Sequence, residues 1–477
     1  DGSFSIGMKK VYNKEEKLNE GINYMIHKYK LNGYNIVLDV NSGAVHTVDN
    51  LTYDILGFID DDAFTGILPK DIYSKLPQYS VAEIDESFVE ICQLVEEGKL
   101  FTEDNYEKLA ESMVNAPVKS MCLNVAHDCN LRCDYCFAAK GNFGGERVLM
   151  PVEVGKKAID FMLEHSKGRH NLELDFFGGE PLMNFDVVKQ VVEYARSKEK
   201  EYNKNFRFTI TTNGLLLDDD KIEYINQEMS NVVLSLDGRK EINDRLRVTP
   251  NGKGSFDVIV PKYVKLVNSR KDKDYYVRGT FTRYNKDFTN DVLKMRDLGF
   301  SQISIEPVVS DPKLSYSIKE DDFPEIFKEY EKLALELLKE ENKKVNFFHF
   351  MIDIDGGPCV IKRLRGCSCG NEYVSVTPEG DIYPCHQFVG EKNWIMGNVV
   401  DGTFDKSMKD EFARTNVYRK EKCKKCWAKF YCSGGCNANN YHYTNSLLEP
   451  HKVSCELEKK RLECAIMMKA HQILNER

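Results

Sequence analysis

Long apolar runs are missing from this sequence of 477 residues: none approaches the roughly 20 residues that cross a bilayer. The first residues, DGSFSIG, lack the apolar core of a signal peptide. Net positive charge is also missing, because the formal charge is −9, whereas a nucleic-acid-binding surface has to be basic. These absences predict a cytoplasmic protein with neither a membrane nor a nucleic acid as its partner.

Cysteine, in contrast, is abundant and unevenly placed. Of the 15 cysteines, four lie between Cys122 and Cys136, and ten occur from Cys359 onward. The cytosol keeps thiols reduced, so a disulfide framework is not expected. The crowding predicts metal or iron–sulfur ligation. Three cysteines outside the recognisable spacings are expected to be apolar core residues: Cys92, Cys122 and Cys464.

The chain divides into segments of different character. Residues 1–24 are expected to form a tail. Within residues 25–115, HKYKL, YNIVLDV and AVHTVD alternate with turn signals at Asn32-Gly33 and Asn41-Ser42-Gly43. This pattern predicts a three-stranded meander, and helical stretches follow it. The segment therefore predicts a small α+β domain.

Residues 116–355 alternate strand-like and helical patterns. Such a series predicts an α/β fold with a parallel sheet, either doubly wound or curled into a barrel. Residues 356–477 hold the crowded cysteines, so metal clusters are expected to support that domain. The six strand-like runs are MCLNVAH, LELDFFG, FRFTITTN, NVVLSLD, YYVRGTFT and QISIEPVV.

Cys129, Cys133 and Cys136 follow the first of these strands in a CxxxCxxC arrangement. Ligands of α/β sheets gather at the carboxyl ends of strands. Three thiolates can hold three irons of a four-iron cluster and leave the fourth iron free for a small molecule. Zinc is the alternative, although a structural zinc site needs a fourth ligand, and the next candidate, Cys122, is expected on the strand itself.

The run Cys-Asn-Leu-Arg-Cys-Asp-Tyr-Cys-Phe resembles the signature of the radical S-adenosylmethionine enzymes. Further motifs of that family follow in order at strand ends: Gly-Gly-Glu-Pro from Gly178, Thr-Thr-Asn-Gly from Thr211, and Ser-Leu-Asp-Gly from Ser235. Asn243 stands where relatives commonly have histidine. The resemblance implies a partial (β/α)6 barrel in which the three cysteines hold a [4Fe-4S] cluster that cleaves S-adenosylmethionine.

The same resemblance implies the cofactor contacts. The glycine pair lets backbone approach a ligand closely, because a side chain there would block it. Glu180 is expected to meet the amino group of the methionine part, and the Ser235 segment with its arginine to meet ribose and carboxylate. The implied cofactor-binding residues are Tyr135, Phe137, Gly178, Gly179, Glu180, Thr212, Asn213, Ser235, Asp237, Arg247 and Ile305.

The C-terminal cysteines resemble the SPASM extension of peptide-modifying radical enzymes, although their spacing alone also fits zinc knuckles. The resemblance implies two auxiliary [4Fe-4S] clusters, three in all. We hypothesise that the nearer one keeps an open iron for a substrate cysteine, with Cys369 or Cys359 as an alternative fourth ligand. The implied ligands are Cys423, Cys426, Cys432 and Cys455 for the distal cluster, and Cys367, Cys385 and Cys436 for the nearer one.

The run HKYKLNGYNIVLDVNSGAVHTVD in residues 25–115 resembles the winged-helix-like leader-recognition element of ribosomal peptide maturases, in particular those of the six-cysteines-in-forty-five (SCIFF) peptides. A sheet edge can bind an extended peptide as an added strand. The alternative is a capping subdomain without a partner.

These resemblances together imply an oxidoreductase that joins a cysteine sulfur to a Cα within a ribosomally made, cysteine-rich precursor peptide. Its leader would bind at residues 25–115, and an external donor would supply electrons. Other radical peptide modifications stay open, namely Cβ thioether formation, carbon–carbon crosslinking and formylglycine formation. A zinc-stapled peptide-binding protein without catalysis is the alternative from another class.

Overall fold

The computed structural model describes residues 25–59, 64–112, 114, 116–354 and 363–475. The chain forms two compact units. Of the described residues, those within 25–109, 353–354 and 469–475 belong to the first unit, and those within 110–352 and 363–468 belong to the second. Each is described by itself, and none of the described helices combines the length and apolar character that crossing a membrane requires.

The first unit contains the predicted meander, which is confirmed as an antiparallel sheet. Asn32 and Gly33 both have positive φ, 49° and 85°, as the type I′ turn of a two-residue hairpin requires. Val37 of the sheet packs with Ile55, Ile84 and Ile91 of the helices. The elements are β1 (Ile26–Leu31), β2 (Tyr34–Asp39), β3 (Val45–Val48), α1 (Asn50–Ile55), α2 (Ile72–Lys75) and α3 (Val81–Glu96); α4 (Glu107–Ser112) follows at the boundary between the units.

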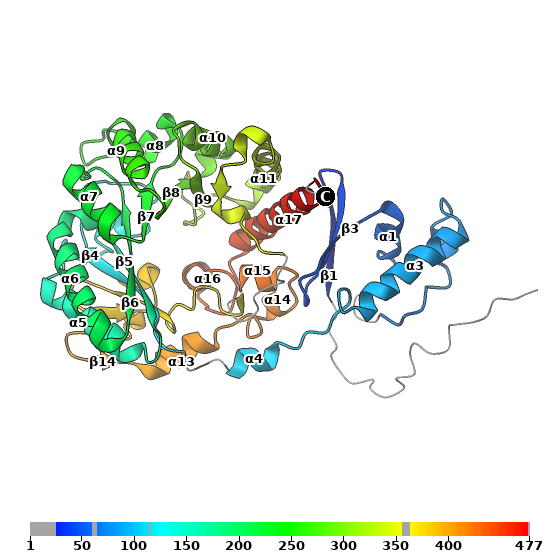
Figure 1. Cartoon of the computed structure of the whole chain (residues 1–477), viewed down its shortest axis with the longest axis horizontal. Helices are drawn as coiled ribbons and strands as arrows, with labels where there is room; N and C mark the ends of the chain where they lie inside the picture. The colour runs from blue at the N-terminus through cyan, green and yellow to red at the C-terminus, as the bar shows by residue number, and fades with distance from the viewer. Residues whose placement is uncertain (1–24, 60–63, 113, 115, 355–362, 476–477) are drawn as a thin grey trace, which may run out of the picture. The chain divides into compact units, whose positions relative to one another are not determined.

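The second unit is built on six parallel strands whose order in the sheet follows their order in the chain. They are β4 (Ser120–Ala126), β5 (Asn171–Gly178), β6 (Asn205–Thr212), β7 (Asn231–Ser235), β8 (Asp274–Phe281) and β9 (Gln302–Pro307). Helices lie along the outer side of this curved sheet (Figure 1): α5 (Val152–His165), α6 (Phe185–Tyr202), α7 (Asp219–Glu228), α8 (Lys240–Leu246), α9 (Phe256–Ser269), α10 (Thr289–Asp297) and α11 (Phe323–Leu337).

The barrel is partial, as the resemblance implied. Among the described strands, β9 is bordered by β10 (Asn346–Phe347) rather than by β4. Alternation along each strand separates two faces. In β5, Leu172, Leu174 and Phe176 are buried, and they alternate with Asp175 and Phe177, which are partly exposed. The face that carries Leu172, Leu174 and Phe176 therefore packs in the hydrophobic core. The other face carries Phe177, which lines the cavity inside the barrel.

The cysteine-rich segment extends the same sheet. Its first strand, β11 (Tyr373–Val376), pairs in parallel with β4, so that β4 is hydrogen-bonded on both sides. Short antiparallel strands continue from it: β12 (Asp381–Tyr383), β13 (Gly397–Asn398) and β14 (Thr403–Phe404). The helices that follow are α13 (Lys406–Arg414), α14 (Glu421–Lys424), α15 (Lys429–Cys432), α16 (Asn437–Thr444) and α17 (Lys452–Asn475).

Candidate functional site

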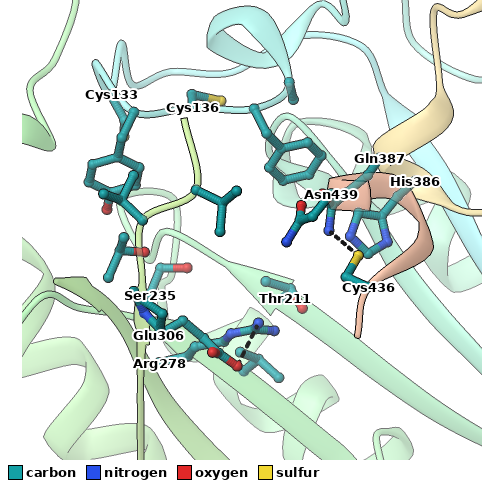
Figure 2. Close-up of a pocket in the computed structure, with 18 of the residues that line it drawn as sticks. Cys133, Cys136, Thr211, Ser235, Arg278, Glu306, His386, Gln387, Cys436 and Asn439 are labelled. Atoms are coloured by element: carbon teal, nitrogen blue, oxygen red, sulfur yellow. Dashed lines mark hydrogen bonds and ion pairs between the residues drawn. The ribbon is translucent and has the colours of Figure 1, made fainter. Parts of the chain in front are cut away.

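A cavity of about 620 Å³ lies in the second unit, bounded by the strand ends and by the cysteine-rich segment. In Figure 2, Cys133 and Cys136 lie at the top of the view, Cys436, His386 and Gln387 lie at its right, and Arg278 and Glu306 lie at the bottom, below the two cysteines. Residues from parts of the sequence that are far apart thus face one space.

The three-cysteine loop is fixed by backbone hydrogen bonds to the last residue of α8 and to the segment that follows this helix. Arg132 N donates to Val248 O at 2.7 Å, and Asp134 N donates to Leu246 O at 3.2 Å. Cys129, Cys133 and Cys136 all line the cavity. The predicted grouping of these thiols at a strand end therefore occurs.

Two donors are directed at the sulfur of Cys129. Leu131 N lies 3.4 Å and Asn213 Nδ2 lies 3.6 Å from Cys129 Sγ. Hydrogen bonds to ligating sulfurs are among the features that tune iron–sulfur clusters. Burial, together with the charges of Glu180 and of the other two thiols, raises the pKa of Cys129 to about 12. Metal cations would relieve that repulsion and hold the thiolate form.

The loop around Cys129 leaves no room for extra side-chain atoms. A Cβ at Gly141 would lie 2.5 Å from Cys129 Cβ, and one at Gly179 would lie 2.2 Å from Asp128 O. Gly141 therefore lets the backbone pack against Cys129, and Gly179 lets backbone form part of the cavity wall. Among the residues that the structure describes, no three potential ligands surround a single point as one bound metal ion requires. The available donors are groups of cysteine thiols, with Cys129, Cys133 and Cys136 in one loop of the cavity wall, a set that fits an iron–sulfur cluster in its chemistry.

Glu180 joins the Gly-Gly-Glu-Pro motif to the end of β6. Its carboxylate accepts hydrogen bonds from Thr212 Oγ1 at 2.8 Å, Asn213 N at 2.8 Å and Leu182 N at 3.1 Å. Burial nevertheless raises the pKa of Glu180 to about 7. A cation at the cavity wall would stabilise its ionised form, so this carboxyl suits an ammonium group.

A second polar group stands at the end of β7. Tyr135 OH donates to Asp237 Oδ2 at 2.6 Å, and Arg247 Nε lies 3.0 Å from the same oxygen. Asp237 Oδ1 accepts from Thr280 N at 2.9 Å. Asn243 is fully buried and donates to Ser255 Oγ at 3.0 Å, so its amide has a structural role. Asp237 thus orients Tyr135 and Arg247, which line the cavity.

Most of the predicted cofactor-binding residues are brought together. Those that line the cavity are Tyr135, Phe137, Gly178, Gly179, Glu180, Thr212, Asn213, Ser235 and Arg247. The expectation for Ile305 is wrong, because Ile305 is buried next to Gly279 in the sheet register, and Glu306 and Pro307 line the cavity instead. Alternation along β9 turns the isoleucine to the opposite face.

A charged group inside the barrel was missed by sequence reasoning. Glu306 Oε1 lies 3.6 Å from Arg278 Nη2, and Glu306 Oε2 lies 3.5 Å from Arg461 Nη1 of α17. Burial opposes the charge of Glu306, but His349, Arg461 and Arg278 outweigh it and lower its pKa to about 2. The inner-face positions of β8 and β9 could have revealed Arg278 and Glu306, whereas nothing in the sequence places Arg461 beside them.

His386 was also missed, although it follows a predicted ligand directly. Its Nδ1 lies 2.9 Å from Tyr373 OH, and its ring packs against those of Phe137 and Phe177, with centroids 5.3 and 5.1 Å away. Burial lowers the pKa of His386 to about 4, so the ring is neutral near pH 7. It gives the cavity wall an aromatic, uncharged surface.

The C-terminal cysteines fall into two sets. In the distal set, Cys426 N donates to Cys423 O at 3.0 Å, Cys432 and Cys455 line the same cavity, and burial, with the charges of Glu458 and the other three thiols, raises the pKa of Cys432. In the nearer set, Cys369, Cys385 and Cys436 share one packed cluster, and the thiols of Cys367 and Cys369 contact each other. The alternative ligand Cys359 lies outside the described residues.

The cysteines expected in the core agree with that expectation in part. Cys122 and Cys464 are buried, whereas Cys92 is partly exposed. Cys122 lies on β4, as expected, and is not among the residues that line the cavity.

Two family models match the chain. Residues 123–271 match the radical SAM superfamily, and residues 367–427 match the SPASM iron–sulfur cluster-binding domain. The first match covers the barrel from β4 to α9, and the second begins at Cys367.

Relatives and solved structures agree with these matches. A cysteine-type anaerobic sulfatase-maturating enzyme of Clostridium novyi is 26% identical over 338 residues, which cover 65% of this chain and 86% of the relative. The antilisterial bacteriocin subtilosin biosynthesis protein AlbA of Bacillus subtilis is 25% identical over 341 residues, 67% of this chain and 68% of AlbA. The fold is similar to that of native anSMEcpe with bound S-adenosylmethionine and the Cp18Cys peptide, with a TM-score of 0.61, 24% identity and coverage of 76% of this chain and 100% of that one.

Proposed function

Because this chain carries a radical S-adenosylmethionine domain and a SPASM domain, we propose that it is a maturase that forms thioethers from cysteine sulfur to Cα in a ribosomally made precursor peptide. The observation that carries the proposal is the shared cavity. It is lined by Cys129, Cys133 and Cys136 and also by Cys436 of the nearer auxiliary set. A peptide in this space would lie between a radical source and an electron acceptor.

The thiol sets identify which residues would hold the cofactors. Three [4Fe-4S] clusters would be bound, one by the barrel cysteines and two by the C-terminal sets. When bound, the cofactors would supply the electron that cleaves S-adenosylmethionine, the radical that removes hydrogen from the peptide, and the acceptor for the surplus electron. The ligands are Cys129, Cys133 and Cys136 in the barrel; Cys423, Cys426, Cys432 and Cys455 in the distal set; and Cys367, Cys385 and Cys436 in the nearer set.

The other residues bind and orient. Glu180 would hold the ammonium of S-adenosylmethionine, and Arg247, oriented by Asp237, would hold its carboxylate. The neutral rings of Phe137 and His386 would exclude water from the reacting atoms. The ammonium-binding carboxyl would thus follow β5, and the carboxylate-binding guanidinium would lie at the end of α8, which follows β7.

The first unit would bind the leader of the precursor. Within the described strands, β3 pairs on one side only, with β2, so its other edge can accept an extended peptide. Deleting residues 25–109 should abolish leader binding in a fluorescence anisotropy assay and leave the cluster spectra unchanged. Leader affinity equal to that of the full chain would contradict this role.

The test of the reaction is mass spectrometry of a cysteine-rich precursor after anaerobic incubation with S-adenosylmethionine and a chemical reductant. Each thioether should remove two hydrogens from the peptide and one free thiol, and fragmentation should place the bond at a Cα. The Cys133→Ala variant is the matched control and should leave the peptide unchanged. An unchanged mass with the loaded wild-type enzyme would refute the proposal.

The similarity to a sulfatase-maturating enzyme favours formylglycine formation as a second candidate. That reaction replaces a thiol by an aldehyde and needs no leader. A sulfatase-derived cysteine peptide that gains an aldehyde, together with an unreactive precursor, would support it. Iron and sulfide analysis separates both candidates from a zinc-stapled binding protein, which would be colourless and contain zinc instead.

A further inference from the structure

The nearer auxiliary set holds one buried thiol more than an open-iron cluster needs. Cys369 precedes β11 and forms a β-bridge with Tyr373. The next residue, Gly370, donates its N–H to Pro384 O at 2.9 Å, which holds this turn beside the segment of Cys385. Cys369 and Cys385 are both buried in one cluster, against which Cys436 packs. Cys369 therefore lies among the expected ligands rather than apart from them.

A buried polar chain ends on the sulfur of Cys369. Lys420 Nζ donates to Gly434 O at 2.7 Å and to Asn437 Oδ1 at 2.8 Å, and Asn437 Nδ2 donates to Cys369 Sγ at 3.5 Å. An ammonium group can only donate hydrogen bonds, so Lys420 must face the amide oxygen of Asn437. The amide NH2 of Asn437 is then directed toward the sulfur of Cys369. The chain thus presents a charge-assisted donor to this thiol.

The environment of Lys420 indicates what its charge compensates. Lys420 is 1% exposed, and burial lowers its pKa; the groups that oppose this and favour its charge are the thiols of Cys423, Cys369, Cys432 and Cys436, from both auxiliary sets. A buried ammonium is costly unless negative charge lies close to it. A neutral core thiol packs as a small apolar group and gains little from such a hydrogen-bond donor. A thiolate, in contrast, is stabilised by it.

We propose that Cys369 is the fourth thiolate ligand of the nearer auxiliary cluster, beside Cys367, Cys385 and Cys436. Lys420, acting through Asn437, is a positioning residue that stabilises its charge. This inference rests on the proposed function and replaces the open-iron hypothesis. The precursor's cysteine would then approach this cluster as a neighbour and not as a ligand.

The ligand is tested on the anaerobically loaded full chain with S-adenosylmethionine present, which occupies the barrel cluster. Cys369→Ala is compared with Cys464→Ala, which removes a buried thiol of α17 outside the cavity lining. Iron per chain and the EPR spectrum of the reduced clusters are recorded with and without 2-mercaptoethanol. Circular dichroism and the spectra of the other two clusters verify folding.

We expect the wild type and Cys464→Ala to show the same iron content and the same EPR spectrum with and without 2-mercaptoethanol. Cys369→Ala should either lose the iron of one cluster or gain a thiol-dependent EPR change, because one iron becomes open. A wild type that responds to the thiol, or a Cys369→Ala variant with unchanged iron and spectrum, overturns the inference. A wild type that loads no cluster at all would instead refute the proposed function.

The positioning role has a separate readout. Lys420→Met should make the midpoint potential of the nearer cluster more negative, because a buried cation favours the more negative, reduced state, and Lys420→Arg should restore it in part. Lys204→Met is the matched control, since Lys204 is buried and its Nζ donates to two backbone carbonyls of the barrel, those of Lys167 and Arg169. Equal potentials in Lys420→Met and the wild type, with full iron content, would refute the role.

Discussion

The affinity for S-adenosylmethionine should fall steeply below pH 7 because of Glu180. Burial raises the pKa of this carboxyl to about 7, so in the ligand-free protein it is half protonated near that pH. A bound ammonium favours the ionised form and lowers the pKa in the complex. Binding then requires loss of the proton, and each pH unit below 7 should weaken binding about tenfold, which is about 1.4 kcal/mol.

The assay is isothermal titration calorimetry of the loaded protein with S-adenosylmethionine at pH 6 and pH 7.5. Below about pH 7.7 the α-amino group of the ligand is itself protonated, so its own titration adds little to the decline. Glu180→Gln removes the ionisable group, and its single amide oxygen can accept only one of the hydrogen bonds that Thr212 Oγ1 and Asn213 N donate to separate carboxylate oxygens. This variant should bind more weakly at pH 7.5 and show little pH dependence.

The reasoning would be refuted by a wild-type affinity that is equal at pH 6 and pH 7.5. It would be refuted equally by a Glu180→Gln variant that retains the full pH dependence, since another group would then be responsible.

Three other substitutions test the geometry. Tyr135→Phe removes the 2.6 Å hydrogen bond to Asp237 and should weaken S-adenosylmethionine binding about 10-fold, as a lost hydrogen bond to a charged group predicts, with unchanged thermal stability as the control. Arg239→Met leaves the buried carboxylate of Asp291 without its 2.8 Å ion pair and should lower the free energy of unfolding by about 3 kcal/mol in calorimetry; a melting temperature equal to that of the wild type would contradict this. Ile305→Val should lower the free energy of unfolding by about 1 kcal/mol and leave the affinity for S-adenosylmethionine unchanged. A loss of affinity would contradict the placement of Ile305 outside the cavity.

The sequence predicted the parts of the site that depend on local order. Gly178 ends a strand and Asn213 directly follows one, both with recognisable hydrophobic runs, and parallel strands bring their carboxyl ends to one edge. Ile305 failed because the side of a strand to which a residue points changes with a shift of one position. The resemblance of the motifs identified the strand, but it did not identify which of its alternating residues face the cavity.

Other parts depend on pairing between distant segments. Nothing local in YVSV, the sequence of β11, says that this short strand joins β4, and the position of Arg461 beside Glu306 follows from where α17 ends up after the sheet has formed. The short extra strands are also weak signals, because two-residue strands such as β13 carry no periodicity. These features follow from tertiary contacts that no local pattern encodes.

The pairing of β11 with β4 means that the cysteine-rich segment cannot be detached as an independent module. A chain ended near residue 355 would leave β4 with a bare row of backbone donors and acceptors along the side that β11 covers in the full chain. Exposed strand edges of this kind promote intermolecular association. Truncated or domain-swapped versions should therefore aggregate, and chimeras should exchange the segment together with β4 or keep both.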